Sequence, residues 1–314
     1  MSKLEIGNQD FLFEPVLNWG KIPSEWDVRV VAGVGIDSHD HIYVLTRGKP
    51  AIIVMNTSGE ILDHWGDDVF TRPHGICITE NAIYGVDDHA HTAFKFDKNR
   101  QLLMTLGKKG QPSDTGYSAN HKVVEHAAGP FNRPTGVAIA KSGDIYITDG
   151  YGNTRVHVFA PDGSLKFSWG TPGKAAGEFN LPHGILIDAD ERVYVADRGN
   201  DRIQIFNLSG QYLDEWTGFI RPAAMSIGPD GNMYVAECKR CSSYTGAPSR
   251  VTIVNMRGEI LARLSASDFY DETLGHHTAH SICVDSEGSI YVGEVGKKIP
   301  EGYFGLRKYK RIHR

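Results

Sequence analysis

The sequence predicts an all-β protein built as a six-bladed β-propeller, and three observations lead to that fold. Glycine accounts for 35 of the 314 residues, or about 11%, which exceeds the ~7% usual in globular proteins. One sequence pattern recurs six times along the chain: a short apolar strand, a polar turn and a second strand centred on an aliphatic-Tyr pair. No segment shows the sustained 3.6-residue apolar period with capping residues that indicates a helix.

The six copies follow one another at short intervals. Their first and second strands are predicted at 33–37 and 42–44, 75–78 and 83–84, 136–139 and 145–147, 184–188 and 193–195, 225–227 and 233–235, and 281–285 and 290–292. The first five copies continue into a third strand, a turn of Asn, Asp or Ser with Gly, and a fourth strand that often ends in Trp-Gly, as at Trp65 and Trp169. Short strands joined by turn residues indicate antiparallel meanders, and four strands in each of six copies indicate a propeller.

The blades are expected to span most of the chain. Their predicted limits are about 28–66, 70–107, 131–170, 179–216, 220–264 and 279–312. The sixth copy ends without a fourth strand, whereas residues 13–20 have the pattern of one and end in Trp19-Gly20. We expect this N-terminal strand to close the last blade, because pairing removes exposed sheet edges. Residues 1–314 are therefore predicted to form a single propeller domain.

Composition and charge exclude several classes of partner. The net charge of −5 provides no basic field for nucleic acid or an anionic membrane. No apolar run approaches the ~20 residues of a membrane helix, and the first residues lack an apolar secretory core. Four cysteines do not make a disulfide scaffold. We expect a cytoplasmic globular protein rich in turns, while its oligomeric state stays open.

Histidine recurs at one position of the repeat, directly before the predicted first strand. The six equivalent residues are Ala32, His74, Thr135, His183, Ala223 and His280. Alternate blades of a six-bladed ring lie about 120° apart, so three imidazoles at one height would point to one axis and leave a fourth position open. A lone histidine there is more often an ordinary hydrogen-bonded residue, but three in register predict a metal site. Zinc or another divalent transition metal would suit these ligands.

The cysteines are less informative. Cys77 and Cys283 fall inside predicted strands and are interpreted as core residues. Cys238 and Cys241 have CxxC spacing but no second pair, so their role stays open between a structural metal, a redox switch and neither.

An acidic residue follows the second strand in five of the six copies. These residues are Asp87, Asp149, Asp197, Glu237 and Glu294. Such regularity indicates a structural role in capping turns through backbone amides.

The residue after this acidic position varies, which is more typical of a functional position. The six residues are Arg47, Asp88, Gly150, Arg198, Cys238 and Val295. Arg47 and Arg198 are candidates to bind a carboxylate or a developing oxyanion. Tyr151, one residue further on, is a candidate acid or base, and Asp88 is the one acidic candidate in the set.

Three motifs in the middle of the chain resemble a known enzyme family. Residues 149–155 (DGYGNTR), 179–183 (FNLPH) and 196–204 (ADRGNDRIQ) are similar to the NHL-repeat propeller of peptidyl-α-hydroxyglycine α-amidating lyase. The resemblance covers most of the chain and is strongest from about 133 to 216. It implies a six-bladed propeller in which three histidines hold a catalytic zinc, with a tyrosine and two arginines around the substrate.

The resemblance also assigns roles to individual residues. The positions that match the zinc ligands are His74, His183 and His280. The positions that match the catalytic tyrosine and the two arginines are Tyr151, Arg47 and Arg198. The implied reaction is cleavage of a carbinolamide, N–CH(OH)–COO⁻, to an amide and an α-oxo acid such as glyoxylate. The implied substrate is a small molecule that carries a carboxylate.

This chain departs from the family at the third histidine. Ser281 stands where the family has an aspartate that helps to bind a structural calcium, which puts that calcium in question. Thr278 stands where the family has a methionine bordering the zinc, which suggests an altered substrate pocket. The insertions at 108–133, 239–250 and 265–278 would shape that pocket, although their roles stay open.

Two other functions remain as alternatives. The first is a different metal-dependent hydrolase or lyase for a small carboxylated metabolite, because one fold supports many reactions. The second is a non-enzymatic NHL interaction module, which would have no reason to place histidine on alternate blades.

Overall fold

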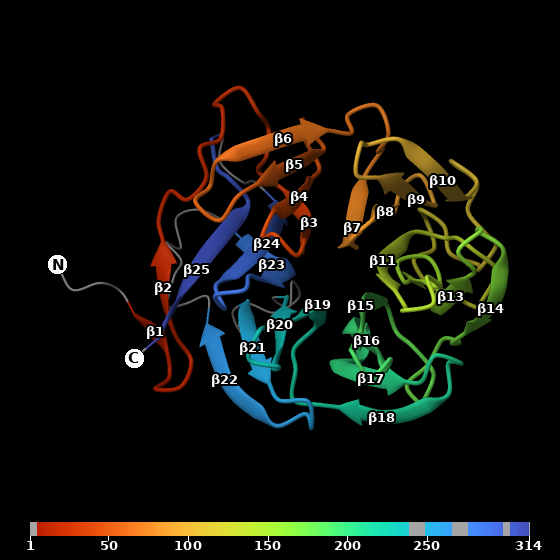
Figure 1. Ribbon diagram of the computed structural model, residues 1–314. Coiled ribbons are helices and arrows are strands. Elements are labelled where there is room, and N and C mark those ends of the chain that lie inside the picture. The colour runs from red at the N-terminus through yellow and green to blue at the C-terminus, as the bar shows by residue number, and fades with distance from the viewer. Residues whose placement is uncertain (1–4, 239–248, 266–275, 298–301, 314) are drawn as a thin grey trace. The chain divides into compact units, whose positions relative to one another are not determined.

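The computed structural model describes residues 5–238, 249–265, 276–297 and 302–313, which form β-strands and one 3₁₀ turn (Figure 1). The strands make six antiparallel sheets, one for each predicted repeat. Two compact units contain three sheets each. We call Phe70–Pro222 the central unit, and Met1–Val69 with Ala223–Arg314 the terminal unit.

The central unit consists of three four-stranded meanders. The first contains β7 (Pro73–Ile78), β8 (Ala82–Asp87), β9 (Thr92–Asp97) and β10 (Leu102–Gly107). The second contains β11 (Pro134–Ile139), β12 (Ile145–Asp149), β13 (Arg155–Phe159) and β14 (Leu165–Trp169). The third contains β15 (Pro182–Ile187), β16 (Val193–Asp197), β17 (Arg202–Phe206) and β18 (Tyr212–Trp216), with the 3₁₀ turn η1 (Arg198–Asn200) after β16.

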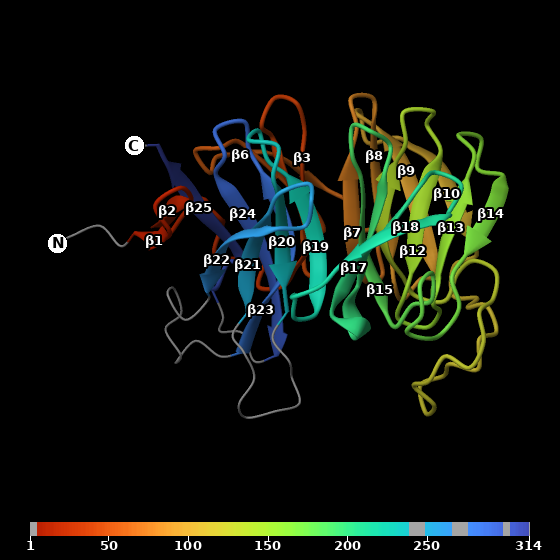
Figure 2. The same ribbon diagram turned by 90° about the horizontal axis from the view of Figure 1, so that it is seen from below.

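The first strands of these three sheets lie together, since β11 contacts both β7 and β15. The long segment between β10 and β11, yellow in Figure 2, projects from one end of the strands. Residues 108–133 thus form an insertion, as predicted.

The terminal unit contains two further meanders. One holds β3 (Val31–Ile36), β4 (Ile42–Thr46), β5 (Ile52–Met55) and β6 (Ile61–Trp65). The other holds β19 (Pro222–Ile227), β20 (Met233–Glu237), β21 (Arg250–Val254) and β22 (Ile260–Ser265).

The sixth sheet joins the two ends of the chain. Its strands are β23 (His276–Val284), β24 (Ile290–Lys297), β25 (Leu306–Ile312), β2 (Leu12–Val16) and β1 (Ile6–Gly7). Because β2 pairs antiparallel with β25, the predicted closure by an N-terminal strand is confirmed. The strand predicted at 13–20 extended too far, since the observed strand β2 ends at Val16. Trp19 lies beyond the strand, where its indole donates a hydrogen bond to the Thr57 carbonyl and packs edge-on against Tyr291.

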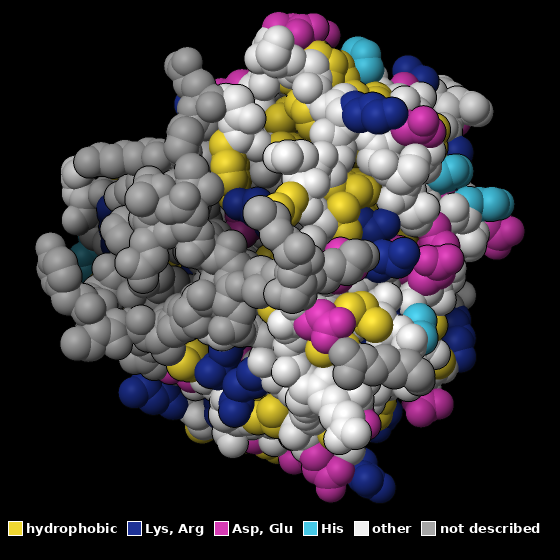
Figure 3. Space-filling view, turned by 90° about the vertical axis from the view of Figure 1, so that its left-hand side faces the viewer, with side chains coloured by type: hydrophobic (Ala, Val, Ile, Leu, Met, Phe, Trp, Pro, Cys, Tyr) yellow, Lys and Arg dark blue, Asp and Glu magenta, His cyan; other side chains and the backbone are white. Residues whose placement is uncertain are grey.

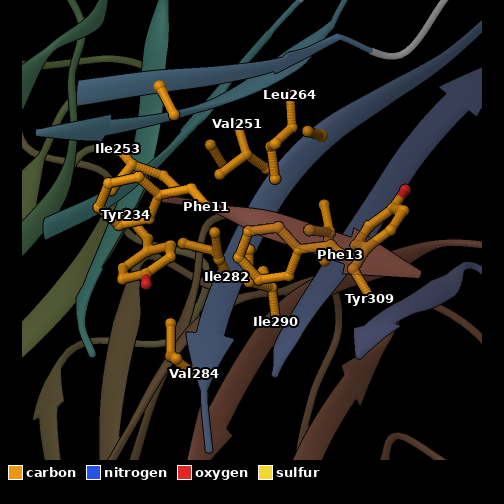
Figure 4. Close-up of a cluster of buried hydrophobic side chains, with 14 of the residues drawn as sticks. Phe11, Phe13, Tyr234, Val251, Ile253, Leu264, Ile282, Val284, Ile290 and Tyr309 are labelled. Carbon is orange, nitrogen blue, oxygen red and sulfur yellow. The ribbon is translucent and has the colours of Figure 1, made fainter. Parts of the chain in front are cut away.

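Burial of the N-terminal segment explains why it completes this sheet. Phe11 and Phe13 lie among apolar side chains of β21, β22, β23 and β24 (Figure 4). Phe13 is fully buried and sits opposite Arg311 in the strand pair. A buried aromatic side chain contributes about 2 kcal/mol or more, so this packing holds the two chain ends in one sheet.

The tyrosine of each second strand has a structural purpose. Tyr146, Tyr194, Tyr234 and Tyr291 are among the largest fully buried side chains of the described residues. The hydroxyls of Tyr194 and Tyr291 each donate a hydrogen bond of 3.0 Å to the aspartate that begins the preceding turn. These tyrosines therefore fill the core, and in the two hairpins of Tyr194 and Tyr291 the hydroxyl also ties the turn to the second strand.

The described residues contain no membrane-spanning helix, and their visible surface carries mixed charges. No helix in the described part of the chain is long and apolar enough to cross a bilayer. On the described surface visible in Figure 3, Lys and Arg side chains are interspersed with Asp and Glu.

Candidate functional site

Each histidine of the repeat lies at a β-bulge inside the first strand, not before the strand as the sequence suggested. In the first sheet of the central unit, Pro73 pairs with Asp87 and Gly75 pairs with Val86, which leaves His74 as the extra residue. The register shifts in the same way around His183 and around His280. A bulge redirects a side chain out of the regular alternation of a strand, so the backbone aims these three residues.

His74 and His183 converge within the central unit. Their side chains are almost completely buried, and ring nitrogens of the two lie within 4.8 Å of each other. The Tyr151 hydroxyl lies 3.0 Å from His74 Nε2 and 3.2 Å from His183 Nε2. Two imidazole nitrogens and a phenol oxygen therefore meet at one point.

The second ring nitrogen of His74 shows which tautomer is present. Nδ1 lies 2.6 Å from the backbone carbonyl of Thr135, so it carries the proton and Nε2 presents its lone pair. In the terminal unit His280 repeats this contact, with Nδ1 2.8 Å from the carbonyl of Ala32. Thr135 and Ala32 are the equivalent residues of the following repeats. An N–H donated to a carbonyl is the usual partner of a metal-ligating histidine, so this donor set fits a transition metal.

Tyr151 is positioned by two arginines of the central unit. Arg198 begins η1, and its Nη1 lies 3.4 Å from the Tyr151 hydroxyl oxygen. The Arg133 guanidinium lies over the Tyr151 ring, with its central carbon 5.1 Å from the ring centre. The backbone N–H of Tyr151 donates to the carbonyl of Arg133. Tyr151 and Arg198, predicted as site residues, are therefore brought together with His74 and His183.

Asp88 is completely buried and belongs to an ion-pair cluster. Its Oδ2 accepts hydrogen bonds of 3.0 Å from Arg72 and 2.9 Å from Arg133. Its other oxygen, Oδ1, is buried and has no hydrogen-bond partner among the described residues. Asp88 is thus connected to Tyr151 through the Arg133 guanidinium, which binds the carboxylate and lies over the tyrosine ring.

The acidic residue at the end of each second strand, directly before the position of Asp88, has a structural role, as predicted. In the central unit a carboxylate oxygen of each residue accepts a hydrogen bond of 2.8 Å from a backbone N–H near the start of its first strand: Asp87 from Arg72, Asp149 from Asn132 and Asp197 from Asn180. These bonds fasten the end of the second strand to the segment that leads into the bulge. They therefore support the histidine positions without occupying them.

Sequence reasoning missed Arg72 and Arg133. Both arginines directly precede the proline that opens a first strand, and the Arg-Pro pair was the signal available for finding them. Tyr117 belongs to the 108–133 insertion, and its hydroxyl accepts a hydrogen bond of 3.1 Å from Arg133.

Arg133 is also held through its backbone and its charge. Its N–H donates to Nδ1 of His91. Burial lowers the pKa of Arg133, but the Asp88 charge and hydrogen bond outweigh it and leave this pKa raised. The guanidinium therefore stays charged beside Tyr151.

The His91 contact predicts a pH-dependent stability. Burial is the largest cause of a pKa of His91 below its ordinary 6.5, so the folded state favours the neutral ring. Below about pH 6.5 the unfolded chain binds this proton more readily, and the free energy of unfolding should fall until the folded ring also becomes protonated. Urea unfolding at about pH 7.5 and about pH 5 measures the loss. In His91→Gln the part of the slope due to this group should vanish, and an unchanged slope would contradict the assignment.

The remaining candidates are distributed as follows. Arg47 follows β4 in the terminal unit, is partly buried and donates its N–H to the carbonyl of Val30. Most residues of the insertions 239–250 and 265–278 lie outside the described part of the chain, as does Cys241. Cys283 is buried, as predicted for a core residue, whereas Cys77 is partly buried and packs against the apolar cluster around Tyr84; burial raises the pKa of both thiols.

Comparison with known proteins agrees with this architecture. A family model described as "6-bladed beta-propeller" matches residues 130–292. NHL repeat-containing protein 3 of Homo sapiens is 30% identical over 321 residues, covering 96% of this chain and 86% of that protein. The chain belongs to the NHL-type six-bladed β-propeller family. The predicted fold is thereby confirmed.

Two further similarities involve proteins named as lyases. Peptidyl-alpha-hydroxyglycine alpha-amidating lyase 2 of Drosophila melanogaster is 29% identical over 285 residues, covering 86% of this propeller and 63% of that protein. A solved structure of streptogramin B lyase aligns with a TM-score of 0.63 at 14% identity, covering 96% of this chain and 98% of that one. The second similarity shows the propeller fold alone, whereas the first is a similarity in sequence to a protein named as an amidating lyase.

Proposed function

We propose that this propeller is a zinc-dependent lyase that cleaves carbinolamides of the α-hydroxyglycine type. The observation that carries the proposal is the meeting of His74 Nε2, His183 Nε2 and the Tyr151 hydroxyl, with Arg198 at the same oxygen. A metal-ligand pair, a potential base and a cation are the components this reaction needs. Similarity to a named α-amidating lyase supports the choice of reaction.

His74, His183 and His280 would hold the zinc. His74 and His280 have the same buried environment and the same Nδ1–carbonyl contact, which leaves Nε2 for a metal in both. Zinc at this position would supply Lewis acidity to the substrate hydroxyl.

The side chains of the protein would divide the remaining tasks. Arg198, joined by Arg47, would bind the substrate carboxylate through charge-assisted hydrogen bonds. Tyr151, as a phenolate, would accept the hydroxyl proton, and its oxygen adjoins the two histidine nitrogens that would hold the zinc. As the C–O bond becomes a carbonyl, the C–N bond breaks and its electron pair leaves on nitrogen. The nitrogen takes up the proton that Tyr151 accepted, which returns Tyr151 to its phenolate form, and the products are an amide and glyoxylate.

A second candidate is a different metal-dependent hydrolase or lyase on the same residues. Thr278, at the position that borders the zinc in the amidating lyases, favours a changed pocket and so a different substrate. An interaction module without activity is less well supported, because burying three polar imidazoles at bulges serves no packing need.

Incubation of the zinc-loaded protein with α-hydroxyhippurate tests the proposal. We expect stoichiometric benzamide and glyoxylate, measured by chromatography and by a glyoxylate-specific assay. Protein stripped of metal with a chelator should be inactive and should recover when zinc is returned. A metal-loaded protein that leaves α-hydroxyhippurate intact would support the second candidate.

A further inference from the structure

Arg72 and Arg133 form a pair of guanidinium groups that the proposed reaction does not use, and the Arg133 guanidinium lies over the Tyr151 ring. Both donate to Oδ2 of the buried Asp88, so one carboxylate holds the two groups near each other. We call Arg72 and Arg133 the outer arginine pair. Their side chains retain 39% and 23% exposure, whereas the Asp88 carboxylate between them retains none.

The outer arginine pair has unused hydrogen-bond donors. A guanidinium has five N–H bonds. Arg133 uses one on Asp88 and one on the Tyr117 hydroxyl, and its Nε is buried with no partner in the described part of the chain. Arg72 has one side-chain hydrogen bond there, to Asp88. Apart from the buried Nε, the N–H groups of the pair that make no hydrogen bond in the described part of the chain therefore remain for a ligand.

The fold does not require this cluster. In the next repeat Leu181 occupies the position of Arg133 with nearly the same backbone, φ 63° against φ 67°. One repeat on, the positions of Arg72, Asp88 and Arg133 are held by Arg133, Gly150 and Leu181, so the same strand geometry is reached there without the ion pairs. Burying a carboxylate with two guanidinium groups carries a desolvation cost that packing alone would avoid. A cluster that is costly and dispensable for folding is typical of a binding function.

The position of the pair indicates which part of a substrate it would reach. Arg198 approaches Tyr151 at the hydroxyl oxygen, whereas Arg133 lies over the ring face. If Arg198 takes the α-carboxylate, the outer pair is left for the other side of the scissile bond, where the N-acyl group leaves. Tyr117 and Arg133 are held in place there, because the 108–133 insertion is anchored by hydrogen bonds from Thr115 to the Gly152 carbonyl and from Asn132 to the Ser113 carbonyl.

We propose that the outer arginine pair binds a second carboxylate, carried by the N-acyl group of the substrate, and that Asp88 is the positioning residue of this subsite. This inference rests on the proposed function and specifies its substrate class: acidic N-acyl-α-hydroxyglycines. Two guanidinium groups presented side by side match the geometry and charge of a carboxylate.

Binding of two unreactive analogues tests the subsite without requiring turnover. N-succinylglycine carries the second carboxylate, and N-succinamoylglycine replaces it with a neutral amide of the same size. Titration calorimetry with the zinc-loaded protein should show that the dicarboxylate binds about ten- to a hundredfold more tightly, the effect expected for charge-assisted hydrogen bonds. Arg133→Gln should bring the ratio of the two dissociation constants to about one.

Two further variants make the result specific. Arg72→Gln, at the more exposed member of the pair, should reduce the same ratio and provides a test if Arg133→Gln folds poorly. Arg257→Gln removes an arginine whose side chain is 80% exposed in the terminal unit and should leave the ratio unchanged. Equal affinities for the two analogues, or a preference that survives both substitutions, would overturn the subsite. Failure of the lyase proposal would appear separately, as loss of the α-hydroxyhippurate reaction.

Discussion

Replacing His183 by alanine is expected to empty the metal centre. The zinc content should fall from about one per chain to below about a tenth, because a site with three protein ligands loses most of its affinity with one of them. The structural reason lies in the pairing of His183 with His74, whose Nε2 is already oriented by the Thr135 carbonyl. Elemental analysis by mass spectrometry after exhaustive dialysis measures the change, and lyase activity should disappear with the metal.

The controls separate metal binding from folding. His183 is 2% exposed, so His183→Gln, which fills the same space, should lose the metal while the urea midpoint shows a folded chain. His121 is about half exposed and pairs with Glu125, and His121→Ala should keep the full zinc content. A native protein that neither contains nor takes up zinc, or a His183→Ala variant that retains it, would remove the metal from the proposed function.

The fold was predictable because a propeller repeats its local chemistry. The hairpins reuse the same turn residues, and each second strand carries a tyrosine that packs in the core and in several copies donates a hydrogen bond to an aspartate, as Tyr194 does to Asp188. Six copies of that pattern leave few alternative architectures. The same register also selected His74 and His183, which the structure brings together.

Other features could not be read from the pattern because they depend on contacts between repeats. The bulges at the histidines follow from strand register, since Pro73 already pairs with Asp87. Trp19 resembled a strand ending but is held by Thr57, a residue of another hairpin. The Arg72–Asp88–Arg133 cluster joins two neighbouring sheets, and no repeat-internal signal announces such a pairing. Local chemistry thus predicted the elements, whereas tertiary pairing decided the surroundings of the site.

Replacing Tyr151 by phenylalanine is expected to keep the metal and remove most of the activity. The substitution deletes one oxygen, which lies 3.0 Å and 3.2 Å from the two histidine nitrogens, and it preserves the ring beneath Arg133. If the phenol accepts the substrate hydroxyl proton, kcat for α-hydroxyhippurate should fall by about a hundredfold or more, the usual contribution of a positioned base. KM should change little, because Arg198 still faces the carboxylate.

Comparison of zinc content, kcat and KM in this variant assigns the role of the Tyr151 hydroxyl. A tyrosine that served only to orient His74 and His183 would, on substitution, lower the zinc content together with kcat. A tyrosine that took part only in binding would raise KM instead. Tyr212→Phe, on β18 in the same unit, is the matched control and should leave zinc content, kcat and KM unchanged. Full activity in Tyr151→Phe with normal zinc would exclude the phenol as the base, and the proton would then have to be accepted by another group at the same point.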